Sequence, residues 1–170
     1  MSYLKSLADD PATPPGEPGP PSITGCFLCD AVLPDQSDEQ KHNMLVLLCD
    51  ERGVLMMNRY PYSNGHVLVA PHQHAADISD LTPQARAGIM ELADLASRAM
   101  RQALNCQGIN LGMNLGRSAG AGVPGHCHMH LVPRWNGDVN FMQVVAGARV
   151  IPQALEESYQ ALHSAIEQVC

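Results

Sequence analysis

The chain has 170 residues, with ten Lys and Arg against 17 Asp and Glu, and its formal net charge is -7 when histidine is neutral. This length suits one hydrophobic core and is short for two. The scarcity of clustered positive charge argues against a broad nucleic-acid-binding surface. No apolar run approaches the roughly 18 residues of a membrane span, and no secretory signal is evident. We therefore expect a single-domain cytoplasmic protein that binds neither nucleic acid nor membranes.

The beginning of the chain is rich in proline. Six of the 13 prolines fall within the first 25 residues, and proline fits neither a helix interior nor a central strand. Residues 1–23 are therefore predicted to be a stiff, disordered arm, and residues 24–170 a single domain. Without a secretory context, the six cysteines are expected to be free thiols or metal ligands rather than disulfides.

Short apolar runs separated by turn residues predict strands in the first half of the domain. A hairpin is expected from residues 43–49 and 54–58, and a third strand from residues 66–71. Thr82 followed by Pro83 is a helix-start signal, because the hydroxyl can cap the helix and proline suits the first helical position.

The second half of the domain alternates between helix and strand. Apolar residues at three- and four-residue spacing predict a long amphipathic helix from Pro83 to about Leu104. A strand over residues 109–114, a glycine-rich loop over 116–125 and a strand over His126–Val132 follow, and a last helix begins after Pro152. Hairpins with segregated helices predict an α+β fold, built from an antiparallel sheet of about five strands, a long central helix and a C-terminal helix.

Three histidines alternate in the last predicted strand: His126, His128 and His130. Side chains two residues apart share one face of a strand, and a neutral imidazole can be a nucleophile, a proton carrier or a metal ligand. A polar strand face with histidines that alternate by chance is the plainer alternative. A zinc site made of all three is disfavoured, because the outer two on one straight strand are roughly 13 Å apart.

The glycine-rich loop leads directly into these histidines. Glycines such as Gly116 and Gly120 let backbone N–H groups approach an anion closely, and Ser118 adds a hydroxyl. A flexible connection is the alternative interpretation. The adjacent imidazoles favour a loop that binds phosphate.

Several segments together resemble the histidine triad family, also called the HIT family. The signature is His126-Cys-His-Met-His-Leu-Val-Pro-Arg134. Further segments that resemble the family are residues 58–71, 77–82 and 112–120. Residues 134–141 and 150–152 are most similar to the branch that contains bacterial-type diadenosine tetraphosphate phosphorylases. The resemblance covers about residues 24–165 and implies a HIT-like fold.

The resemblance implies an enzyme that acts on a nucleoside phosphate. His128 would attack the α-phosphorus and form a nucleotidyl-histidine, which phosphate or water resolves. His130 and the backbone amides of residues 118–120 would stabilise the phosphate charge. Asn58 would contact the ribose, and Asn114 the phosphate or the leaving group. A nucleotide substrate, with any Mg²⁺ that it carries, and a homodimer are also implied.

A Cys-x-x-Cys pair, Cys26 and Cys29, can supply half of a zinc site. The resemblance implies His74 and His126 as the other two ligands, as in zinc-bearing bacterial members of the family. Four protein ligands make a closed, structural zinc site. A redox pair or two ordinary buried cysteines are the alternatives. Phosphorylase-like members do not all carry the pair, so the chain combines features of two branches.

Other functions and roles stay open at this stage. A nucleoside phosphoramidase or adenylyl hydrolase would use the same histidines, and a nucleotide-binding module would keep the pocket with little turnover. Asn58 can also be read as a strand-end turn residue and His66 as a strand-edge histidine. Trp135 could stack on a base or cover a dimer interface.

Overall fold

The computed structural model describes residues 21–138 and 155–170. The predicted arm before residue 21 and the segment 139–154 lie outside the described residues. In chain order the elements are α1 (Phe27–Ala31), α2 (Asp38–Asn43), β1 (Val46–Asp50), β2 (Gly53–Met57), β3 (Val67–Ala70), η2 (Ile78–Asp80), α3 (Pro83–Leu104), β4 (Gly108–Met113), η3 (Arg117–Ala119), β5 (Met129–Arg134) and α5 (Leu155–Val169).

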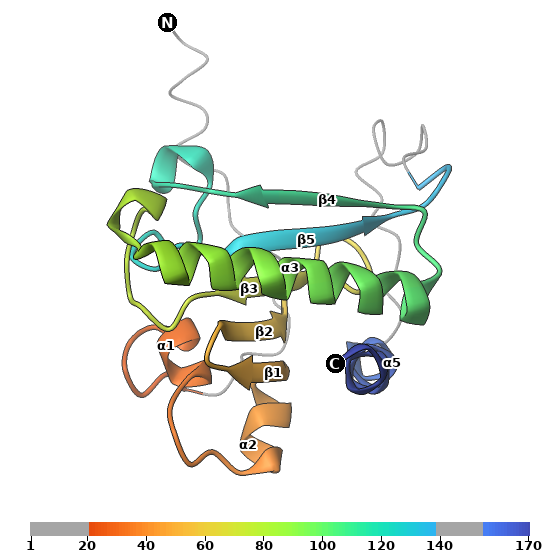
Figure 1. The fold of residues 1–170 in the computed structure, drawn as a ribbon, viewed down its shortest axis with the longest axis horizontal. Helices are drawn as coiled ribbons and strands as arrows, with labels where there is room; N and C mark the ends of the chain where they lie inside the picture. Colours follow the sequence, from red (N-terminus) through yellow and green to blue (C-terminus); the bar gives the residue numbers. More distant parts are fainter. Residues whose placement is uncertain (1–20, 139–154) are drawn as a thin grey trace, which may run out of the picture.

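The five strands form one sheet in the order β1-β2-β3-β5-β4 (Figure 1). Every neighbouring pair is antiparallel. Strand β2 begins directly after the turn with Gly53, whose φ of 141° and close approach to the Ala70 carbonyl leave no room for a Cβ atom. The predicted α+β fold with an antiparallel sheet of about five strands is confirmed.

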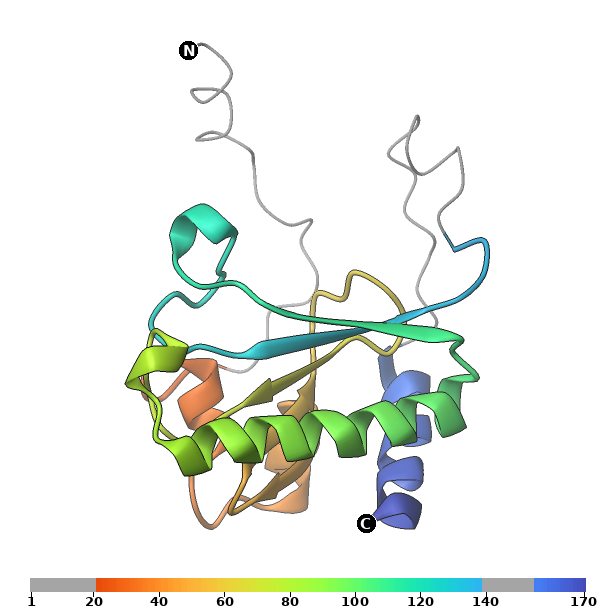
Figure 2. The ribbon, with the colours of Figure 1, turned by 45° about the horizontal axis from the view of Figure 1, so that its top comes forward.

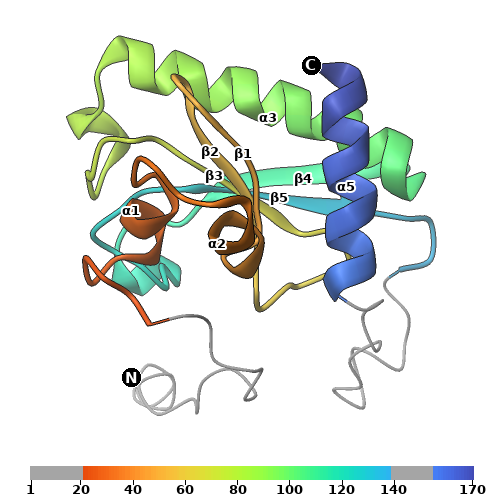
Figure 3. The same ribbon diagram turned by 90° about the horizontal axis from the view of Figure 1, so that it is seen from below.

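The sheet separates two clusters of buried side chains. Alternate residues of a strand face opposite sides, so Leu55 and Val69 pack toward α3 while Met56 and Leu68 pack toward α1. Figure 3 shows α3 on one side of the sheet and α1 and α2 on the other. The face toward α1 is the one that carries the candidate site.

The long helix begins and ends where the sequence predicts. The Thr82 side chain accepts a hydrogen bond from the Ala85 backbone N–H, and Pro83 occupies the first helical position. The C-terminal helix α5 crosses near the end of α3 (Figure 2), and its Tyr159 hydroxyl donates to the Val46 carbonyl at 3.0 Å. Among the helices of the described residues, none has both the length and the apolar character to cross a membrane.

Three local predictions differ from the structure. The short helices α1 and α2 were not expected, and the first strand begins at Val46 rather than at residue 43. The histidine strand begins at Met129, so His126 and His128 precede it. In the segment before Met129, the Cys127 N–H donates to the carbonyl of Ala75, which follows β3, at 2.7 Å instead of joining the sheet ladder.

Candidate functional site

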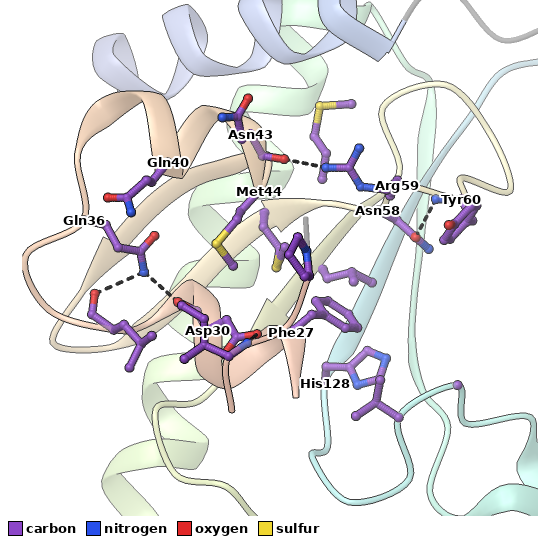
Figure 4. A pocket seen from close by; sticks show the side chains of 18 of the residues that line it. Phe27, Asp30, Gln36, Gln40, Asn43, Met44, Asn58, Arg59, Tyr60 and His128 are labelled. Carbon is purple, nitrogen blue, oxygen red and sulfur yellow. Dashed lines mark hydrogen bonds between the residues drawn. The ribbon is translucent and has the colours of Figure 1, made fainter. Parts of the chain in front are cut away.

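A cavity of about 840 Å³ opens on the α1 side of the sheet. Its wall combines His128 and His130 with Asn58, the first residue after β2, and with residues from the segment before β1. Figure 4 shows His128 and Asn58 in this wall. The apolar part of the wall includes Phe27 and Met44. Small-molecule sites are commonly apolar cavities of this size with a few convergent polar groups.

The imidazole of His128 is held in one tautomer. Its Nδ1 lies 2.9 Å from the backbone carbonyl oxygen of His126. A carbonyl only accepts, so Nδ1 carries the hydrogen and donates. In the neutral ring the other nitrogen, Nε2, then has a free lone pair. His128 is 5% exposed and lines the cavity, so this arrangement suits a nucleophile.

A second histidine pair sets the tautomer of His130. The Tyr62 backbone N–H donates to His66 Nδ1 at 3.2 Å, so that nitrogen must be an acceptor. The neutral ring of His66 therefore carries its hydrogen on Nε2, which lies 3.0 Å from His130 Nδ1. His130 accepts this bond and keeps its own hydrogen on Nε2. A donor is thus available beside the lone pair of His128, and the two rings are 4.9 Å apart between centroids.

Sequence reasoning missed His66, which it took for a strand-edge residue. The register pairs Leu68 with His130 across β3 and β5, and His66 shares the parity of Leu68. The two histidines therefore meet on one face. A prediction that β3 pairs with β5 would have placed His66 beside His130.

Burial keeps this histidine pair neutral. His66 is fully buried, and burial lowers its pKa to about 3, with a further contribution from the charges of His130 and His128. Burial, followed by the His128 charge, lowers the pKa of His130 to about 4. Both rings therefore stay uncharged at neutral pH.

The low pKa of His66 predicts a loss of stability in mild acid. In the unfolded chain its pKa is about 6.5, whereas in the folded chain it is about 3. Between these two pH values the unfolded state binds a proton at His66 and the folded state does not. The free energy of unfolding should therefore fall as pH drops from 6.5 toward 3, by at most about 1.4 kcal/mol per pH unit for this group.

Urea unfolding at pH 6.5 and pH 5 checks this expectation on the parent and on His66→Asn, both freed of metal. The variant should lose less stability over this interval than the parent. Equal losses in the two proteins would mean that His66 does not titrate as its burial requires.

Asn58 and Tyr62 complete the surroundings of His66. The Asn58 side chain lies with Nδ2 3.3 Å from His66 Nδ1 and accepts a hydrogen bond from the Tyr60 N–H through Oδ1. The Tyr62 ring stacks on His66, with centroids 4.8 Å apart. Asn58 therefore has a positioning role besides its place in the cavity wall.

Cys26, Cys29, His74 and His126 come together on the α1 side of the sheet, and one ligand atom from each lies within 4.8 Å of the others. Cys29 Sγ is 3.1 Å from His74 Nδ1 and 3.4 Å from His126 Nδ1. Tetrahedral zinc with ordinary bond lengths separates sulfur and nitrogen ligands by about 3.5 Å. The cluster could therefore hold zinc with small adjustments.

The tautomer of His126 also fits a metal ligand. Its Nε2 donates to the Pro71 carbonyl at 3.0 Å, so the lone pair of the neutral ring is on Nδ1. Nδ1 faces the two sulfur atoms, at 3.5 Å from Cys26 and 3.4 Å from Cys29. A carbonyl that orients a ligating histidine through its other nitrogen is a common feature of metal sites.

The glycine-rich loop contributes to the cavity at one of the predicted positions. Gly120 lines the cavity, whereas Asn114, Gly116 and Ser118 are not among its lining residues. The Gly120 N–H donates to the Arg117 carbonyl at 3.0 Å, and the Asn114 amide donates to the Gly120 carbonyl at 3.4 Å. In this conformation the loop is closed on itself.

Comparisons with known proteins identify the family to which this chain belongs. A family model of the HIT domain matches residues 39–137. The chain is 37% identical over 130 residues to the AP-4-A phosphorylase of Mycobacterium tuberculosis strain H37Rv, which covers 76% of this chain. The aligned part spans 65% of the length of that relative.

Solved structures give the same result for the fold. A Zn-bound histidine triad family protein from Mycobacterium smegmatis is 31% identical, with a TM-score of 0.67 over 85% of this chain and 95% of the other. A diadenosine triphosphate hydrolase from Plasmodium falciparum, at 18% identity and a TM-score of 0.58, covers 74% of this chain and 76% of its own, and is similar in fold alone. The chain therefore belongs to the HIT domain family.

Proposed function

We propose that this protein is an enzyme that cleaves dinucleoside polyphosphates of the diadenosine tetraphosphate type through a nucleotidyl intermediate on His128. The observation that carries the proposal is the fixed tautomer of His128, which leaves the Nε2 lone pair free on a buried ring in the cavity wall. The similarity to a protein named AP-4-A phosphorylase supports the substrate class.

The reaction has two steps at the α-phosphorus. In the first, His128 Nε2 forms a bond to phosphorus while the bridging oxygen leaves with its electron pair as the nucleoside polyphosphate. The Nδ1 hydrogen stays on the ring, and the His126 carbonyl stabilises the positive charge that the imidazole gains. In the second step, an oxygen of inorganic phosphate or water forms a bond to the same phosphorus while the P–N bond breaks and its electron pair returns to Nε2. The proton that the attacking group loses passes to solvent, and the neutral imidazole is restored.

The neighbouring groups would support the charge that develops on phosphate. His130 Nε2–H can donate to a non-bridging oxygen, and His66 keeps that ring neutral and oriented. Gly120 lies at the cavity wall, and Gly116 and Ser118 of the same glycine-rich loop would reach a longer polyphosphate. Asn58 would bind the ribose, and Asn114 the phosphate or the leaving group.

We propose a structural role for zinc in the same domain. The ligands would be Cys26, Cys29, His74 and His126, whose ligand atoms already lie within 4.8 Å of one another. Bound zinc would hold α1 against the end of the sheet and take no part in the transfer. The Zn-bound structural relative supports this assignment.

We also propose that the protein is a homodimer. β4 is an edge strand paired on one side to β5, and Leu111 on it is 48% exposed. An exposed edge with apolar side chains is a natural site for association. Light scattering should give twice the chain mass of 18.3 kDa, and Leu111→Lys should shift the population toward monomer. A monomer at all concentrations would contradict the proposal.

Product analysis tests the proposed reaction. The protein is incubated with diadenosine tetraphosphate, with and without inorganic phosphate, and the nucleotides are separated. ADP plus ATP formed only with phosphate is the result expected of a phosphorylase, whereas AMP plus ATP identifies water as the acceptor. Turnover of a nucleoside phosphoramidate alone would favour the phosphoramidase. Tight nucleotide binding without turnover would favour a binding module.

A further inference from the structure

Gln36 has a buried side-chain oxygen without a hydrogen-bond partner. The Nε2 atom of its amide donates to the Asp30 carbonyl at 2.6 Å and to the Leu33 carbonyl at 3.1 Å. Carbonyls cannot donate, so these two bonds fix which end of the amide is the oxygen. Within the described residues, Oε1 is buried and unpartnered. Such an acceptor costs free energy, and its presence in a folded protein calls for an explanation.

The residue that carries this oxygen lines the cavity that contains the nucleophile, and the oxygen itself is covered. Gln36 and His128 both line this cavity, and the close-up shows them toward opposite ends, with Phe27 between them (Figure 4). Met44 lines the same cavity (Figure 4). The unbranched thioether side chain of methionine repacks easily, so Met44 would yield to the edge of a flat ring that approaches Gln36.

The position of Gln36 identifies which part of a nucleotide it would meet. If the phosphorus lies at His128, the base extends along the apolar wall that includes Phe27 and Met44 and reaches Gln36 with its edge. The group that satisfies Oε1 must be a hydrogen-bond donor. Gln40 lines the same cavity (Figure 4). Its Oε1 accepts from the Ser37 N–H at 2.9 Å, so the N–H₂ end of its amide is a donor.

We propose that Gln36 is the residue that selects adenine, because its Oε1 accepts a hydrogen bond from the 6-amino group of the base. This inference rests on the proposed function, which places a nucleotide in the cavity. Adenine offers a donor at C6 and ring-nitrogen acceptors beside it, which complement the Gln36 acceptor and the Gln40 donor. Hypoxanthine and guanine carry a carbonyl at C6, so two acceptors would oppose each other.

Equilibrium binding of three ligands to the full chain tests the proposal. The ligands are AMP, purine riboside 5′-monophosphate, which has hydrogen in place of the amino group, and IMP. The parent should bind AMP about tenfold more tightly than purine riboside monophosphate, as expected for one hydrogen bond to a buried acceptor, and should bind IMP most weakly. In Gln36→Met the ratio between AMP and purine riboside monophosphate should fall to about one.

The ratio separates recognition from a structural effect. If Gln36 only supported the structure through its bonds to Asp30 and Leu33, Gln36→Met would weaken the binding of all three ligands alike. The ratio between AMP and purine riboside monophosphate would then stay at the parent value. Gln36→Lys can still donate to both carbonyls but has no acceptor, so it should lose the ratio as well and serves if the methionine variant does not fold. Gln84→Met, on the exposed side of α3, is the matched control and should keep the tenfold preference.

Three outcomes would overturn the inference. A parent that binds AMP and purine riboside monophosphate equally, or a Gln36→Met variant that keeps the preference, rules out Gln36 as the reader of the amino group, while the proposed reaction survives. A parent that binds none of the three nucleotides overturns the proposed function together with the inference.

Discussion

His128→Ala is expected to lower the rate of diadenosine tetraphosphate cleavage by about 10⁴-fold, because it removes the group that bonds to phosphorus in the proposed mechanism. His130 and the cavity wall would remain, so the affinity for AMP should change by less than about threefold. The measurement is steady-state product formation together with nucleotide binding. Acid-quenched mass spectrometry should detect a covalent nucleotidyl adduct on the parent and none on the variant.

His163→Ala is the matched control for this experiment. His163 is a surface histidine on α5, with Nδ1 3.9 Å from a Glu167 carboxylate oxygen, outside the cavity. Its loss should leave the rate within twofold of the parent. A His128→Ala variant that retains more than about a tenth of the parent rate would refute the nucleotidyl-histidine route.

Cys29→Ser is expected to abolish zinc binding and to destabilise the domain. A ligand present at 1,000 times its dissociation constant stabilises the folded state by about 4 kcal/mol, which corresponds to a fall of about 10 °C in melting temperature for a chain of this size. Metal analysis of protein purified without chelator should find about one equivalent of zinc in the parent and almost none in the variant, and thermal unfolding measures the loss.

Cys49→Ser is the control, because Cys49 is an exposed cysteine on β1 that lies outside the cluster. Its zinc content and melting temperature should match those of the parent. Chelator added to the parent should lower its melting temperature to that of Cys29→Ser. A parent with much less than one equivalent of zinc, or a Cys29→Ser variant that keeps its zinc, would refute the structural site.

The elements that could be predicted from the sequence are those whose signals lie within the element itself and recur along it. The cap and the proline at Thr82 and Pro83 predicted the start of α3 correctly, and the apolar spacing predicted its length. The short helices α1 and α2 were missed because five or six residues are too few to show a helical period. The capping box of Ser37 and Gln40 was the only available signal for α2.

The histidine segment shows what a pattern alone leaves out. Alternation predicted a strand from His126, but strand β5 begins at Met129. The His126 side chain instead faces the two cysteines, and its backbone carbonyl binds His128. The two cysteines lie at the start of α1, about 100 residues earlier in the chain. Local periodicity carries no information about partners at that distance.

The two ends of the cavity are encoded in different parts of the chain. The histidines that would face phosphorus in the proposed reaction are His128, which directly precedes β5, and His130 on β5, whereas Gln36, Gln40 and Met44 precede β1. A chimera that exchanges residues 33–44 for those of a relative would therefore alter the nucleobase accepted without touching the groups that break the bond. Within this fold, substrate preference can diverge by replacing one contiguous stretch of chain while the chemistry is inherited unchanged.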